Sequence, residues 1–65
     1  MTAVSKRLID VREASTYLGL AVGTLYNLVS MKQIPHVKLG RKLLFDLKDL
    51  DKWIEESKVE VIDID

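Results

Sequence analysis

Residues 11–29, VREASTYLGLAVGTLYNLV, decide the fold of this chain. Apolar residues recur at helical spacing from Val11 to Leu18, which predicts a first helix over about these residues. Gly19 follows, and glycine readily takes the left-handed conformation that ends many helices. At the other end, Asp10 is a predicted N-cap, because its carboxylate can accept hydrogen bonds from the free N–H groups of the first turn.

The same stretch predicts a second helix. An apolar stripe from Leu25 to Val29 lies on one helical face, and the pattern begins near Val22. Pro35 stops this helix, since the residue before a proline avoids helical dihedrals, and the helix is expected to end near Met31 or Lys32. The short connection between the two helices favours a steep crossing over a long crossover.

Downstream of Pro35 the pattern changes to that of a hairpin followed by a helix. Polar and apolar residues alternate from His36 to Leu39, Gly40 marks a turn, and a strand-like run ends at Phe45. Asp46 then caps a predicted third helix that reaches about residue 57. The sequence therefore predicts a mostly α fold with a small β-hairpin, in the order helix, turn, helix, hairpin, helix, which is a winged helix-turn-helix.

Composition and charge limit the function. The chain has 65 residues, 48% of them hydrophobic and 31% charged, which is typical of one small globular domain. It has no cysteine and one histidine, so disulfides and thiolate metal sites are excluded. No apolar run is long enough to span a membrane and no signal peptide is recognisable, so a cytoplasmic location is expected.

No arrangement of residues predicts catalysis. The carboxylates of the third predicted helix, at Asp49, Asp51, Glu55 and Glu56, fall on different sides of an exposed helix and are expected to be solvated. No phosphate-binding glycine loop, catalytic triad or metal-ligand spacing is present. The sequence therefore predicts a protein that is not an enzyme and that needs no metal or cofactor.

The charges are unevenly distributed along the chain. Residues 1–45 carry seven basic and two acidic side chains, whereas residues 46–65 carry three basic and eight acidic ones. The first part can meet a polyanion, although ordinary solvated surfaces account for such a division equally well. Tyr17 and Trp53 lie on apolar helical stripes and are expected in the core rather than in a nucleic-acid stacking platform.

Five short segments, in order, resemble a known family. They are VREASTYLG at 11–19, TLY at 24–26, IP at 34–35, KLGR at 38–41 and DLDKWI at 49–54. Together they resemble the excisionase-type helix-turn-helix domain, which is related to the MerR DNA-binding domain and includes AlpA-like regulators. The resemblance covers about residues 8–56.

This resemblance implies a small DNA-binding protein of phage, transposon or bacterial origin. Such proteins bend or mark DNA for a site-specific recombinase, or regulate transcription. The expected partners are double-stranded DNA and either an integrase or RNA polymerase, with the protein a monomer or a weak, DNA-dependent oligomer. The chain then divides into a flexible basic arm at 1–7, the DNA-binding domain at 8–57 and an acidic tail at 58–65.

In such a protein the recognition helix, about 22–31, enters the major groove, and the wing, about 36–45, contacts the backbone or the minor groove. Asn27 is expected to contact an adenine edge, and Arg41 suits a narrow A·T minor groove. Gly23 has two interpretations, since it either starts the helix or lets the helix N-terminus approach a phosphate. The candidate DNA-binding residues are Val22, Gly23, Thr24, Tyr26, Asn27, Lys32, Lys38, Arg41 and Lys42.

The sequence also departs from the family pattern. Ala21 and Val22 stand where the family has a Ser or Thr cap and a basic or polar residue, so the recognition helix has no cation before Lys32. Phosphate neutralisation is then left to the wing and the arm. The alternative hypothesis is a protein-interaction module that keeps the helix-turn-helix fold without binding DNA.

Overall fold

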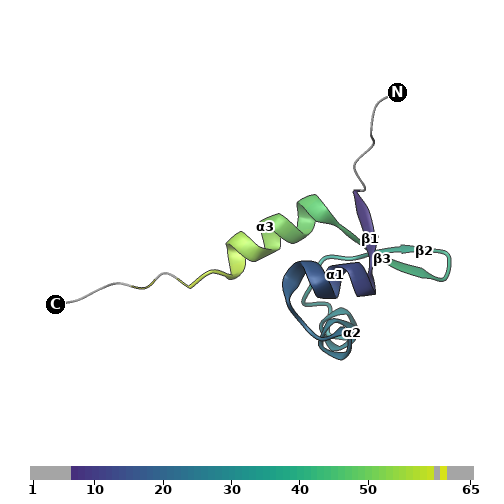
Figure 1. Ribbon diagram of the computed structural model, residues 1–65, viewed down its shortest axis with the longest axis horizontal. Helices are drawn as coiled ribbons and strands as arrows, with labels where there is room; N and C mark the ends of the chain where they lie inside the picture. The colour runs from purple at the N-terminus through teal and green to yellow at the C-terminus, as the bar shows by residue number, and fades with distance from the viewer. Residues whose placement is uncertain (1–6, 60, 62–65) are drawn as a thin grey trace, which may run out of the picture.

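Three helices and a small antiparallel sheet make up residues 7–59 and 61, the part of the chain that the computed structural model describes (Figure 1). In chain order the elements are β1 (Leu8–Asp10), α1 (Val11–Leu18), α2 (Val22–Ser30), β2 (Val37–Leu39), β3 (Lys42–Asp46) and α3 (Leu47–Ser57). The predicted winged helix-turn-helix is confirmed. Most of the expected basic arm and acidic tail lies outside the described residues.

The ends of α1 follow from local hydrogen bonds. The Asp10 carboxylate accepts from the Glu13 N–H at 2.8 Å, and the Glu13 carboxylate accepts from the Asp10 N–H at 3.1 Å. This reciprocal capping box satisfies N–H groups that the first helical turn leaves free. At the other end Gly19 has φ 70°, and its N–H donates to the Ser15 carbonyl at 2.9 Å. The predicted bounds of the first helix are confirmed.

The start of α2 lacks a side-chain cap. Ala21 is the N-cap residue, and no side-chain hydrogen bond satisfies the first N–H groups. Because the helix already begins at Val22, the interpretation that Gly23 starts it is wrong, and Gly23 lies in the first turn.

The sheet has β3 in its centre, with β1 and β2 on either side. The predicted hairpin of β2 and β3, which we call the wing, closes through a two-residue turn, because Leu39 pairs with Lys42. Gly40 opens this turn with φ 60°, as two-residue hairpins require of their first central residue. Strand β1 was not predicted; it pairs with β3 so that Ile9 lies opposite Phe45.

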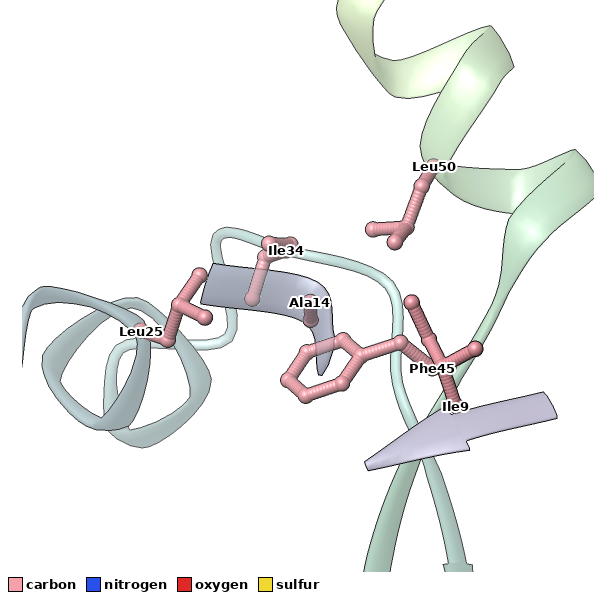
Figure 2. Packing of buried hydrophobic residues seen from close by; sticks show 6 residues of the cluster. All are labelled: Ile9, Ala14, Leu25, Ile34, Phe45 and Leu50. Carbon is pink, nitrogen blue, oxygen red and sulfur yellow. The ribbon is translucent and has the colours of Figure 1, made fainter. Parts of the chain in front are cut away.

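The core takes one apolar side chain from every element except β2 and one from the segment between α2 and β2, and Figure 2 shows them pointing toward one another. Ala14 of α1 and Leu25 of α2 are both fully buried where the two helices pack together. The small Ala14 side chain lets α2 approach closely. The Phe45 ring, also fully buried, lies on the helical side of the sheet. The core residues are Ile9, Ala14, Leu25, Ile34, Phe45 and Leu50.

The junction of β3 and α3 is held by a buried carboxylate. Asp46 is only 8% exposed, and its carboxylate accepts from Nε of Arg7 at 3.0 Å and pairs with the second guanidinium nitrogen at 2.9 Å. It also caps α3 by accepting from the Lys48 N–H at 3.0 Å. Arg7, expected in a flexible arm available to phosphates, is therefore engaged within the domain.

Two further hydrogen bonds hold α3 against the body. The Tyr17 hydroxyl donates to the Asp51 carboxylate, and Nε1 of Trp53 donates to the Gln33 carbonyl at 2.9 Å. The bond to Asp51, followed by burial, raises the pKa of Tyr17. The prediction that Tyr17 belongs to the core is wrong, since the side chain is 48% exposed, and Trp53 packs only against the edge of the core.

Asp46 should make the stability of the fold depend on acid pH. The hydrogen bond from Arg7 lowers the pKa of Asp46, and the Lys48 N–H adds to this, while burial opposes both. Because the folded pKa lies below the unfolded value of about 4, the stabilisation is complete above that pH and is lost as the pH falls through the folded pKa. We expect Asp46→Asn, which keeps a helix-capping oxygen, to lower the free energy of unfolding at pH 6 and much less at pH 3.

Urea unfolding of both proteins between pH 3 and pH 7 measures this difference. Arg7→Gln should produce the same pH dependence, and combining the two substitutions should add little, because both remove one ion pair. A difference between wild type and Asp46→Asn that stays constant over the whole pH range would contradict the assignment.

Candidate nucleic-acid interface

The outer face of α2 is exposed and carries no charge. Leu25 anchors the helix in the core, so the residues on the opposite face point to solvent. Tyr26 is 52% exposed, which agrees with the expectation that it lies off the apolar face. Val22 is half-buried at the start of the helix. The exposed residues of this face are Gly23, Thr24, Tyr26, Asn27 and Ser30.

Beside this face an open groove lies between α2 and the wing, and the start of α1 also lines it. We call it the strand groove. Its half-buried floor is apolar, and exposed polar side chains stand above that floor. The floor consists of Val11, Val29 and Leu43, and the exposed side chains are Asp10, Arg12, Tyr26, Lys38 and Arg41.

The register of the wing explains which of its cations face the groove. Lys38 pairs with Leu43, and Leu43 lies on the same side of β3 as the buried Phe45, which is the side that faces the helices. Lys38 therefore points to the strand groove, with Arg41 at the turn. Lys42 alternates to the other side and lines a separate hollow with Leu44 and Leu8. The structure thus brings two of the three predicted wing cations together with Tyr26.

Lys32 ends α2 in an unusual backbone conformation. Its φ is 56°, and it is the one described residue other than glycine with a positive φ. The Gln33 N–H donates to the Leu28 carbonyl at 2.8 Å and the Lys32 N–H to the Val29 carbonyl at 3.0 Å, which is the pattern that usually has glycine at this place. The exposed Lys32 side chain therefore lies two residues beyond the end of α2.

Arg12 is the one groove cation that sequence analysis missed. It lies in the first turn of α1, far from the wing along the chain, and its side chain is exposed. The sequence places it on the polar side of a helix and gives no sign of what that side faces. Only the packing of α1 against β3 and α2 brings it to the strand groove.

Two carboxylates lie near the cations of the candidate interface, since Asp10 lines the strand groove and Asp10 and Glu13 line the hollow of Lys42. Among the described residues, no ion pair involves any of four cations, Arg12, Lys38, Arg41 and Lys42. Figure 1 shows α3 extending away from the body in the direction opposite to the wing. The carboxylates of α3 are exposed. The uneven charge distribution of the sequence is therefore also a separation in space.

Other kinds of site are not apparent in the part of the chain that the structure describes. No group of three or more histidine or carboxylate side chains there could hold a metal ion. No helix over those residues is long and apolar enough to cross a bilayer. Asp49, Asp51, Glu55 and Glu56 are all exposed on α3, where nothing desolvates them.

Comparison with known proteins gave one match. A family model described as a helix-turn-helix domain matches residues 8–58, which includes every described helix and strand. No curated protein and no solved structure matches the chain significantly.

The left-handed conformation of Lys32 should reduce stability. The left-handed conformation costs a residue with a Cβ about 1–2 kcal/mol, and glycine avoids this cost. Glycine also makes the unfolded chain more flexible, which offsets part of the gain in stability. We expect Lys32→Gly to raise the free energy of unfolding by about 0.5–1 kcal/mol. Denaturant titration measures it, with Lys52→Gly within α3 as a control that should lower stability by about 1 kcal/mol. A less stable Lys32→Gly protein would show that the lysine side chain itself supports the fold.

Proposed function

Because the chain belongs to the helix-turn-helix family of the excisionase and AlpA type, we propose that it is a small protein that binds and marks or bends a duplex DNA site. Its role is that of an excisionase-like recombination directionality factor or of an AlpA-like transcription regulator. The family match supports DNA binding by a helix-turn-helix. The mechanism is binding without catalysis, and members of this family are typically not enzymes.

One observation carries the proposal: an exposed, uncharged helix face lies directly beside a groove lined by cations that form no ion pair within the described residues. A major groove about 12 Å wide admits one α-helix, and α2 presents an exposed, uncharged face on the side opposite the buried Leu25. With α2 there, the wing reaches the adjoining backbone and minor groove. Arg41 at the wing tip suits a narrow A·T minor groove, which attracts guanidinium groups.

Recognition of bases by α2 rests on neutral groups. Residues 22–30 contain no lysine or arginine, so the bidentate cation contact to guanine is absent from this helix. Asn27 can both donate to and accept from an adenine edge, and Val22 offers a methyl surface to a thymine. Thr24 and Tyr26 supply hydroxyl groups beside them, and Gly23 leaves room for a close approach to the backbone.

The remaining candidate residues hold the phosphates. Lys38 and Arg41 line the strand groove, where they contact the DNA strand beside α2. Lys42 lies on the other side of the hairpin and contacts the DNA strand that borders the minor groove beyond the wing. Lys32 continues α2 with a positive charge. A single module of this size buries only about 600–1,000 Å² on DNA, so tandem sites or a protein partner such as an integrase or RNA polymerase supply the further specificity.

The wing should supply most of the electrostatic part of binding. Each phosphate contact contributes about −0.9 to the slope of log K against log salt, so Lys38→Ala combined with Arg41→Ala should flatten that slope by roughly two units. The loss should be equal for all sequences, because phosphates carry no base information. Fluorescence-anisotropy titrations of a random duplex from 50 to 300 mM salt measure the slope. No salt-dependent binding by the wild-type protein would favour the interaction-module alternative.

Asn27 should behave in the opposite way. A bidentate contact to one base contributes about 1–3 kcal/mol of discrimination, so Asn27→Ala should weaken binding to a selected site by that amount and change random-duplex binding little. Selection from a random DNA library supplies the site, and the same titrations on both duplexes supply the comparison. Equal losses on the two duplexes would show that Asn27 does not read a base.

A further inference from the structure

The strand groove has a shape that the proposed docking itself requires. If α2 lies in a major groove and the wing lies in the adjoining minor groove, one sugar–phosphate strand must run between them, because that strand is what separates the two grooves. The space between α2 and the wing is the strand groove, and nothing in the described chain fills it.

On this basis we propose that Arg12, together with Lys38, Arg41 and Tyr26, clamps the sugar–phosphate strand that passes between α2 and the wing. Arg12 then contacts a phosphate from the α1 side, and the two wing cations contact phosphates from the opposite side. The Tyr26 hydroxyl can donate to a phosphate oxygen between them. The inference rests on the proposed function and adds to it a DNA contact from α1, outside both the recognition helix and the wing.

The chemistry of the groove fits both parts of a DNA strand. Deoxyribose is largely apolar on its edge, and the floor of Val11, Val29 and Leu43 offers it apolar contact. Phosphates carry the charge, and the cations stand above the floor, where side chains are exposed. A guanidinium such as that of Arg12 matches phosphate geometry with two parallel hydrogen bonds.

One acidic residue also lines the groove. The Asp10 carboxylate would repel a phosphate, but it accepts the Glu13 N–H at 2.8 Å and lies at the positive end of α1. Its charge is thus partly compensated by the helix that it caps. The three groove cations outnumber it.

The position of Arg12 is unfavourable for the isolated fold. A positive charge in the first turn of a helix meets the positive end of the helix dipole, and Arg12 pairs with no other described residue there to offset this. The cation therefore opposes local stability at the place where it faces the groove. Removing it should leave folding intact, which makes it a clean test of binding.

The experiment compares Arg12→Ala, Arg12→Lys and Lys52→Ala with the wild-type protein. Lys52 carries the same charge but lies on α3, in a hollow with Pro35 and Glu56 away from the strand groove. Each protein is titrated with a 20-base-pair random duplex over a range of salt concentrations, and its thermal unfolding is recorded without DNA.

Arg12→Ala should flatten the salt slope by about one unit, the share of one phosphate, while its melting temperature stays the same or rises. Arg12→Lys should keep the wild-type slope, because the slope counts the phosphates neutralised. Lys52→Ala should also keep it.

A wild-type slope in Arg12→Ala, with a flattened slope in the double wing variant, would overturn the clamp and leave the proposed function standing. Equal flattening in Arg12→Ala and Lys52→Ala would also overturn it, since the effect would then follow net charge rather than position. If the wild-type protein shows no salt-dependent binding, the proposed function itself fails.

Discussion

The Asp46 carboxylate joins three parts of the chain, and the placement of β1, of the start of α1 and of α3 depends on it. It receives the Arg7 guanidinium, it caps α3, and it ends the central strand of the sheet. With Arg7 held there, and the Leu47 N–H bonded to the Arg7 carbonyl at 3.0 Å, strand β1 is aligned on β3. This alignment sets Asp10 opposite Leu44 and so fixes where α1 begins, at residues that line the strand groove.

A fixed start of α1 also fixes α2, because the two helices share the core. Ala14 and Leu25 are both fully buried, and Phe45 packs against them from the sheet. The wing includes β3, the strand that carries Phe45. One set of apolar contacts therefore places the wing and α2 relative to one another. The strand groove is therefore the gap between two rigidly related elements rather than a space between mobile loops.

Local signals in the sequence predicted the helices and the hairpin. Asp10 and Gly19 affect only the backbone a few residues away, so the bounds of α1 could be predicted directly from the sequence. The predicted and observed ends of α2 differ, because Lys32 takes a left-handed conformation and α2 ends at Ser30. Strand β1 could not be predicted, because a strand of three residues has too little alternation to distinguish it from a loop and exists only through pairing with β3. The places of Tyr17 and Arg12 depend on tertiary contacts for the same reason.

Lys32 and Arg12 share a property that links stability to function. Each is a cation at a position where the backbone alone would favour a different residue: glycine at the left-handed end of α2, and an acidic or neutral residue in the first turn of α1. Natural sequences usually follow local rules, and departures are expected where a surface serves another purpose. In this chain α2 carries no cation of its own, so the positive charge near it comes from the ends of helices and from the wing. The two local departures fall at such helix ends.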